Sequence, residues 1–408
     1  MAYLKRALER KFTKMDDFFK VLLVTGARQV GKTTMLRHLS ADQNRTYVTL
    51  DDLAVRDLAK SDPALFFQTY KPPIIIDEVQ YAPELFSQIK LICDQSDETG
   101  LFWLTGSQQF EMMKNIQESL AGRVGIFGMY PLSFSEKSGI FFENNLDFTI
   151  ETLQERRKKT TPNDIEKVFE HIWRGGMPQV MHADDERRDA YYNAYVNTYI
   201  MRDVAELGGV RDTLTFSKFL TACAALVGEQ LNYKRLADTV EISQPTAKEW
   251  VRLLVGMGII YLLKPFANNE LKRLTKTPKL YFCDTGLAAY LSMWLTRETL
   301  MSGAASGHYF ENFVVMELVK NYAYGKTEAN LTYYRDSNGK EIDVLVEHGR
   351  LIHPLEIKKS AFPDKRSIKN FNVIEKAALE RGIGGIVCLC ENVHPIDSEN
   401  NFIPCNFI

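Results

Sequence analysis

Residues 26–33 constrain the fold of this chain more than any other stretch. They read Gly-Ala-Arg-Gln-Val-Gly-Lys-Thr, and the apolar run Val21 to Thr25 directly precedes them. The glycines at positions 26 and 31 let the backbone curl so that successive amides face phosphate groups. A helix that starts after the loop adds the positive end of its dipole. The pattern therefore predicts a P-loop between a strand and a helix, within a parallel α/β domain.

Each position of this loop has an expected role in holding a nucleotide. Lys32 should reach the β- and γ-phosphates, and the Thr33 hydroxyl should bind Mg²⁺. We expect the cofactors ATP and Mg²⁺, with a phosphate-binding set that comprises Gly26, Ala27, Arg28, Gln29, Val30, Gly31, Lys32, Thr33 and Thr34.

Two adjacent acids follow the next buried strand of this pattern. Pro72 to Glu78 reads Pro-Pro-Ile-Ile-Ile-Asp-Glu, an apolar run that ends in carboxylates. Asp77 can help to position Mg²⁺ while Glu78 polarises the attacking water. The alternative interpretation is a solvated strand end, but a P-loop upstream favours the catalytic one.

Two further candidates lie later in the same domain. Ser107 follows the run Leu101 to Gly106, where a small polar side chain could sense the γ-phosphate, although an ordinary turn fits the same residues. Arg123 is the candidate transition-state arginine because charge that develops on phosphoryl oxygens needs a cation. An ordinary surface arginine is the alternative, and Arg202 is another candidate for this role.

The middle of the chain is mainly helical. A charged stretch at 144–166 separates it from the first domain, and 185–207 reads as one amphipathic helix. Three helices at 214–226, 233–239 and 244–257 are then expected, followed by strands at 259–263 and 279–283. These strands flank a basic loop at 268–279 with Lys272, Arg273, Lys276 and Lys279. This order resembles a winged helix-turn-helix.

The late segment 334–358 reads as two strands around a turn at 348–350. If the strands pair about that turn, Asp343 falls opposite residue 355 or 356. Glu356 and Lys358 are two apart and share a face, and Glu311 on a preceding helix could complete the cluster. These acids predict a second divalent-metal site beside a lysine. The alternative is a solvated hairpin whose acids pair with Lys340, Lys358 and Lys359.

The amino-terminal third of the chain resembles an AAA+ ATPase domain. The whole chain is similar to a widespread group of bacterial and archaeal AAA-type ATPases with a carboxy-terminal domain of uncertain function. The motifs that carry this resemblance are 26–33, 75–80, 104–107, 120–123, 130–134, 199–203 and the late segment. An acid followed by Glu-x-Lys also resembles the restriction-endonuclease-like, PD-(D/E)XK-type fold.

The resemblance implies an α/β fold class with a parallel sheet. Its expected parts are a P-loop AAA+ ATPase domain at 1–143, a charged linker and helical region at 144–211, a winged helix-turn-helix at 212–300 and a nuclease-like α/β domain at 301–408. It transfers the catalytic roles to Lys32, Thr33, Asp77 and Glu78, with looser roles for Ser107 and Arg123. Lys358 would serve the nuclease-like site.

Composition bounds the location and the partners. Lys and Arg number 50 against 52 Asp and Glu, so global charge does not indicate nucleic acid. Six cysteines without a disulfide pattern and the absence of a long apolar run predict a cytoplasmic protein with no membrane partner.

Two functions remain open from the sequence. The first is an ATP-hydrolysing homo-oligomer that acts on DNA through its winged helix and nuclease-like domain. The second is a nucleotide-gated switch or scaffold that recruits a protein partner and carries an inactive nuclease-like domain. Glu78 favours the first, since a switch does not need a catalytic base, whereas the low basicity favours the second.

Overall fold

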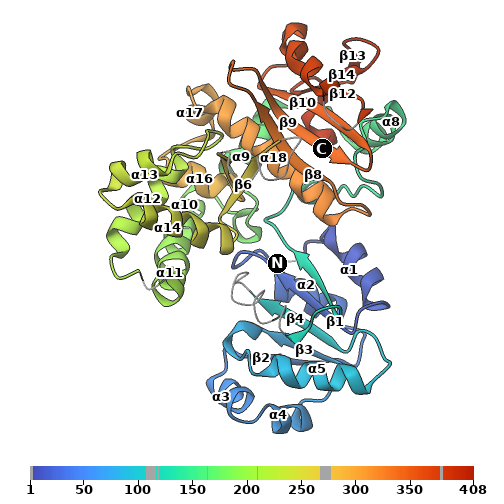
Figure 1. The fold of residues 1–408 in the computed structure, drawn as a ribbon, viewed down its shortest axis with the longest axis vertical. Helices are drawn as coiled ribbons and strands as arrows, with labels where there is room; N and C mark the ends of the chain where they lie inside the picture. Colours follow the sequence, from blue (N-terminus) through green and yellow to red (C-terminus); the bar gives the residue numbers. More distant parts are fainter. Residues whose placement is uncertain are drawn as a thin grey trace. The chain divides into compact units, whose positions relative to one another are not determined.

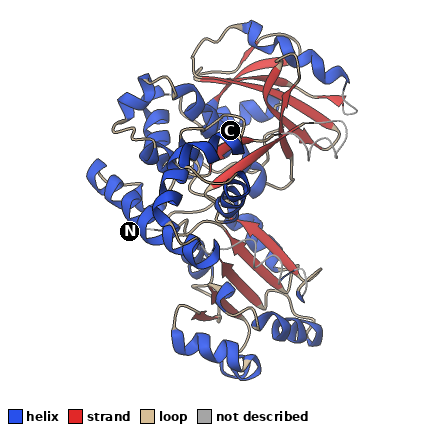
Figure 2. Ribbon diagram, turned by 60° about the vertical axis from the view of Figure 1, so that its left-hand side comes forward, coloured by secondary structure: helices blue, strands red, loops and turns tan. Residues whose placement is uncertain are grey.

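The computed structural model describes residues 3–106, 116, 119–162, 164–208, 210–266, 277–376 and 380–408. The chain forms two compact units, which are residues 1–132 with 256–258, and residues 133–255 with 259–408. Figure 1 labels the elements of both units, and Figure 2 colours their strands red. The finer division into four domains stays a prediction.

The first unit is built on a parallel sheet with the strand order β2-β3-β4-β1-β5. Its strands are β1 Val21–Thr25, β2 Thr46–Thr49, β3 Ile74–Asp77, β4 Phe102–Gly106 and β5 Val124–Gly128. Every residue of β1, β3 and β4 is buried, as continuous apolar runs predict for the centre of a parallel sheet. The predicted α/β class with a parallel sheet is confirmed.

Short helices connect these strands. They are α1 Leu8–Asp16, α2 Lys32–Leu39, α3 Leu53–Ser61, α4 Pro63–Thr69 and α5 Leu85–Gln95, with a 3₁₀ turn η1 at Val79–Tyr81. Aspartates begin two of them, since the Asp52 side chain accepts from the first-turn amides of α3 and Asp62 does so for α4. Because the strands are parallel, their carboxyl ends lie at one edge of the sheet, where the predicted phosphate-binding loop follows β1 and Asp77 ends β3.

The second unit begins with helices. Its helices are α7 Phe134–Lys137, α8 Ile150–Lys159, α9 Ile165–Arg174, α10 Asp185–Ala194, α11 Met201–Gly208, α12 Thr213–Ala224, α13 Tyr233–Val240, α14 Gln244–Gly256, α16 Thr285–Leu291, α17 Arg297–Ser302 and α18 Ser306–Tyr324. Short 3₁₀ turns lie at Pro178–Val180 and Cys405–Phe407, and a longer 3₁₀ segment spans Lys365–Lys376. A π-helical segment, Tyr195–Ile200, interrupts the single helix that the sequence predicts at 185–207. Among the described residues, no helix is long and apolar enough to span a membrane.

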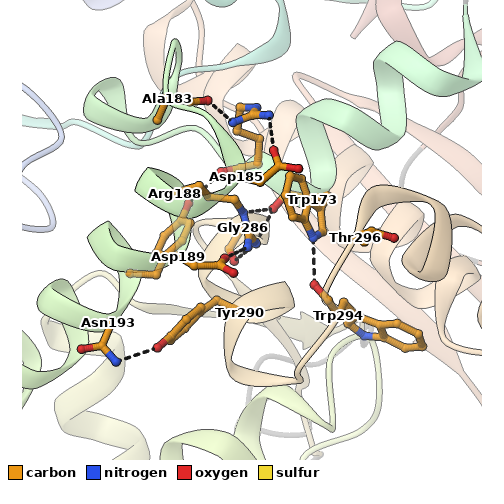
Figure 3. A network of polar contacts seen from close by, with 12 residues as sticks. Trp173, Ala183, Asp185, Arg188, Asp189, Asn193, Gly286, Tyr290, Trp294 and Thr296 are labelled. Atoms are coloured by element: carbon orange, nitrogen blue, oxygen red, sulfur yellow. Dashed lines mark hydrogen bonds and ion pairs between the residues drawn. The ribbon is translucent and has the colours of Figure 1, made fainter.

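A buried arginine joins α9, α10 and α16. The Arg188 guanidinium donates to the Trp173 carbonyl at 2.7 Å and to the Gly286 carbonyl at 3.2 Å, and it stacks 3.9 Å from the Trp173 ring centroid. Figure 3 shows this network, in which the Trp173 indole also donates to the Trp294 carbonyl. These hydrogen bonds link α9 and α10 to α16 and to the segment before α17.

A mixed sheet ends the second unit. It follows the order β13-β14-β12-β10-β9-β8-β6-β7, with β11 beside β10. Its strands are β6 Ile260–Pro265, β7 Lys279–Phe282, β8 Asn330–Arg335, β9 Glu341–His348, β10 Leu351–Lys358, β11 Glu380–Arg381, β12 Gly384–Cys388, β13 His394–Pro395 and β14 Asn400–Pro404. The predicted hairpin about 348–350 is confirmed, because β9 and β10 are antiparallel and pair Val344 with Leu355.

The same sheet includes the hairpin that follows the three helices α12, α13 and α14. β6 and β7 pair with each other, and β6 also runs parallel to β8. The order of three helices and two strands agrees with the sequence expectation, while the winged-helix interpretation stays a prediction. The structural consequence is that the first residue of β7, Lys279, lies within the carboxy-terminal sheet.

Candidate functional site

Two glycines shape the predicted phosphate-binding loop between β1 and α2. Gly26 has a φ of 149°, and a Cβ there would lie 2.1 Å from the carbonyl oxygen of Met129. Gly31 has a φ of 99° and begins α2. Both positions require a residue without a side chain, the first because of close backbone approach and the second because of its left-handed conformation.

Lys32 lies inside the curve of this loop. Its ammonium group donates to the carbonyls of Gly26 at 3.0 Å and Ala27 at 2.8 Å, and its side chain is buried. The guanidinium of Arg6 holds the loop from behind by donating to the Val30 carbonyl at 2.7 Å. The ammonium group of Lys32 is therefore held at the first two residues of the loop.

Asp77, at the end of β3, is surrounded by hydroxyl groups. Its Oδ1 accepts from the hydroxyl of Thr33 at 2.6 Å and from that of Thr105, and its Oδ2 accepts from the Tyr47 hydroxyl at 3.0 Å. Magnesium takes oxygen ligands of this kind and keeps several waters. The Thr33 and Asp77 oxygens thus fit a nucleotide-bound magnesium ion.

Glu78 follows with a left-handed backbone, since its φ is 56°. Its amide donates to the Thr105 hydroxyl at 3.1 Å, and its carboxylate accepts from the Gln80 side chain. The Arg28 guanidinium lies 4.0 Å from the same carboxylate. These contacts hold the candidate base beside the phosphate-binding loop.

Thr105 and Tyr47 are site residues that the sequence analysis missed. The register pairs Ile76 with Leu104, so the next residues, Asp77 and Thr105, are neighbours at the carboxyl edge of the sheet. That signal needs the strand order, which a single sequence does not give. The predicted sensor Ser107 lies outside the described residues.

Arg123 lies far from the phosphate-binding loop of its own chain. It immediately precedes β5, whose first residue pairs with Val21 at the start of β1, whereas the loop follows Thr25 at the end of β1. The five residues of β1 separate these edges by about 16 Å. The Arg123 side chain is part-exposed and pairs with Asp94 at 2.7 Å.

A second group of charged side chains lies where β7, α18 and β9 meet. The ammonium of Lys279 is 2.9 Å from the Glu311 carboxylate, 2.7 Å from Glu341 and 3.9 Å from Asp343. The Tyr281 hydroxyl also donates to Glu311 at 2.6 Å. The predicted acids do come together, but around Lys279, which the sequence analysis assigned to the basic loop and not to this cluster. We call these five residues, with Glu356 and Lys358, the carboxylate cluster.

Lys358 closes the other side of this cluster. Its ammonium lies 3.2 Å from Asp343 and 2.7 Å from Glu356, and the amide of Ile357 donates to Asp343 at 2.8 Å. The register carried one step beyond Val344 and Leu355 sets Asp343 opposite Glu356, as predicted. Among the described residues, no group of His, Cys, Asp and Glu has the arrangement of a metal site.

Burial and charge shift the pKa values in the cluster. Burial, and then the Asp343 charge, raise the pKa of Glu356 to about 8 and also raise the pKa of Glu311. Burial alone would lower the pKa values of Lys279 and Lys358, but the surrounding carboxylates raise both above the ordinary value. Both lysines therefore stay charged at neutral pH.

Three family models match parts of the chain. Residues 18–138 match the AAA domain, residues 165–298 match a domain of unknown function (DUF8612), and residues 306–408 match another domain of unknown function (DUF4143). The amino-terminal unit therefore carries an AAA-type ATPase domain, as the resemblance implied.

Relatives from distant organisms span most of the chain. An uncharacterized protein of Mycobacterium tuberculosis is 28% identical over 374 residues, which cover 90% of this chain and 75% of the relative. One from Methanocaldococcus jannaschii is 24% identical, covering 81% and 74% respectively.

The chain is also similar to several solved structures. One is a Walker-type ATPase of Pyrococcus abyssi, with 16% identity and a TM-score of 0.46, and the match covers 71% of this chain and 96% of that one. The Thermotoga maritima RuvB Holliday junction branch migration motor has 18% identity and a TM-score of 0.27, covering 66% and 91%.

Proposed function

We propose that the chain binds ATP with Mg²⁺ at residues 26–34 and hydrolyses it with Glu78 as the base. Lys32 would anchor the β- and γ-phosphates, while Thr33 and Asp77 would hold the ion that bridges them. The observation that carries the proposal is the 2.6 Å contact between the Thr33 hydroxyl and Asp77 beside the loop. This contact supports the proposal, because the two oxygen atoms that would bind the ion lie next to each other.

The test separates binding from turnover. Lys32→Ala should abolish binding of a fluorescent ATP analogue, because the phosphates lose their cation. Glu78→Gln should keep binding and lose turnover by about 10²-fold or more, because only water activation is removed. Comparable turnover in Glu78→Gln and the unaltered protein would exclude Glu78 from the mechanism.

We also propose that the active form is a homo-oligomer in which Arg123 acts on a neighbouring subunit. The position of Arg123 at the opposite edge of the sheet supports an action in trans, since it cannot approach the loop of its own chain. Mixing Arg123→Ala subunits with Lys32→Ala subunits should recover turnover that neither variant shows alone. Full turnover by a monomer would contradict this arrangement.

Hydrolysis would serve an action on DNA. The helix α14 and the basic loop after β6 would provide the contacts of a winged helix, although Lys272, Arg273 and Lys276 lie outside the described residues. ATP turnover should rise when single- or double-stranded DNA is added. Turnover that ignores both would favour the other candidate, a nucleotide-gated scaffold that recruits a protein.

A second candidate activity is metal-dependent cleavage of phosphodiester bonds in the carboxylate cluster. Glu311, Asp343 and Glu356 would hold a second divalent ion, with Lys358 beside the attacking water. The convergence of Asp343, Glu356 and Lys358 favours it. Plasmid and single-stranded DNA incubated with Mg²⁺ or Mn²⁺ should be cleaved by the unaltered protein and not by Asp343→Ala or Lys358→Ala. Cleavage that survives both changes would reject the assignment.

A further inference from the structure

The loop that follows β10 presents an aromatic side chain to solvent. Phe362 is 94% exposed, more than any other large hydrophobic residue in the part of the chain that the structure describes. The next residue, Pro363, restricts the backbone here. Moving a phenylalanine side chain out of water lowers the free energy, so this position suits a residue that a ligand covers.

Phe362 borders a groove with a volume of about 740 Å³. Four parts of the second unit form it, namely the start of α9, the loop after β10, the segment after β12, and β13 with β14. The apolar lining includes Ile165, Leu389 and Phe402, and the polar lining includes Lys365 and one acid, Glu391. The groove thus combines the aromatic ring of Phe362, apolar walls and the ammonium group of Lys365.

The segment that carries Phe362 is strongly basic. Residues 358–369 contain five Lys or Arg and a single acid, Asp364. Arg366 pairs with that acid at 2.6 Å. Lys365 and Lys369 are exposed, and no ion pair is recorded for either among the described residues. The ammonium groups of Lys365 and Lys369 are therefore exposed where they could contact phosphates.

We propose that this groove binds single-stranded nucleic acid, with one base stacked on Phe362 and the backbone phosphates on Lys365 and Lys369. An aromatic side chain reaches a base face only where the base is unstacked, which favours a single strand over a duplex. The loop begins directly after Lys358, a residue of the carboxylate cluster. The proposal rests on the proposed action on DNA and names the substrate class.

The test uses the full chain and fluorescein-labelled oligothymidine without ATP. Phe362→Ala should weaken binding about tenfold, because stacking on one base is lost. Leu295→Ala is the matched control, since Leu295 is also an exposed hydrophobic residue of the second unit, at 66%, but does not line the groove. The combined change Lys365→Gln and Lys369→Gln should reduce the slope of log affinity against log salt by about 1.4.

Phe362→Trp gives a local readout. Oligothymidine should quench the added tryptophan fluorescence, and affinity should be kept. If the unaltered protein binds neither oligothymidine nor duplex DNA, the proposed action on DNA fails together with this inference. If it binds DNA but Phe362→Ala binds equally well and the new tryptophan is not quenched, only the groove assignment fails. Quenching by an apolar peptide instead of the oligonucleotide would identify a protein-binding groove and overturn the proposal.

Discussion

The nucleotide site and the carboxylate cluster both gather acids at buried strands, but they give those acids different partners. In the first, the recorded partners of Asp77 within the described residues are the hydroxyls of Thr33, Tyr47 and Thr105. In the second, Asp343 lies beside the ammonium groups of Lys279 and Lys358. One carboxylate is thus held by neutral donors and the other by cations.

The difference shows why acids alone do not define a metal site. A carboxylate that accepts from hydroxyls keeps its full negative charge and can attract a divalent cation. One that pairs with buried lysines has already exchanged its hydration for an internal cation. A metal ion at the second position has to compete with Lys279. The following predictions test this contrast, beginning with the largest expected effect.

Asp77→Asn should reduce ATP turnover by about a thousandfold, because the ion that stabilises the transferring phosphoryl group loses its charged ligand. The fold should tolerate this change, since the amide oxygen can still accept from Thr33 and Thr105, while the amide nitrogen can donate to the Tyr47 hydroxyl oxygen. Steady-state turnover and a guanidinium unfolding curve measure the two effects. If the variant loses enough stability to account for the lost turnover, the contrast drawn between Asp77 and Asp343 is wrong.

Asp343→Asn should instead reduce the free energy of unfolding by about 3 kcal/mol, because it removes a partner from two buried or partly buried lysines. Asp336→Asn is the matched control. It lies in the turn before β9 and makes the same chemical change, but its carboxylate accepts from the backbone amides of Asn338 and Lys340. Equal destabilisation by the two changes would show that the lysines around Asp343 are not the cause.

These two regions also differ in how much of them the sequence predicted. The loop at 26–33 and the acids after β3 are local motifs, so spacing alone located them. Lys279 is 32 residues from Glu311 and 62 from Glu341, and the pairing of β6 with β8 helps to bring its strand to the cluster. The sequence predicted the acids of the cluster and Lys358 but not Lys279, because that pairing is a tertiary contact.

The same limit applies to Thr105. Its strand was predicted, but its contact with Asp77 depends on β4 lying between β3 and β1. Helix boundaries fared better where the apolar period is local, because the helices predicted at 214–226, 233–239 and 244–257 correspond to α12 Thr213–Ala224, α13 Tyr233–Val240 and α14 Gln244–Gly256. Local chemistry was therefore accessible from the sequence, whereas partners set by strand order were not.

Lys279→Met should convert the cluster into a better cation site. Removal of the internal cation leaves Glu311, Glu341 and Asp343 with excess negative charge, so Mn²⁺ should bind at least tenfold more tightly than to the unaltered protein. Electron paramagnetic resonance of free Mn²⁺ measures this directly. Mn²⁺ should also raise the melting temperature of the variant more than that of the unaltered protein, which separates metal binding from a folding defect. Lys264→Met, an exposed change on β6, is the control. Equally tight Mn²⁺ binding by the unaltered protein would mean that Lys279 does not compete.

Tyr47→Phe should have the smallest effect, because it removes one neutral hydrogen bond to Asp77 and no charge. Such a bond contributes about 1 kcal/mol, so the apparent Mg²⁺ affinity during ATP turnover should change about fivefold or less. Burial, and then the Asp77 charge, raise the pKa of the Tyr47 hydroxyl to about 12. The group stays protonated through neutral and mildly alkaline pH, and its stabilising hydrogen bond is lost only as the pH approaches that value. The ratio of the Mg²⁺ affinity of the unaltered protein to that of Tyr47→Phe should therefore be constant between pH 7 and about 9. A ratio that changes across this range would show that Tyr47 acts on Asp77 through the charge of an ionised hydroxyl. The partners of Asp77 would then not all be neutral donors.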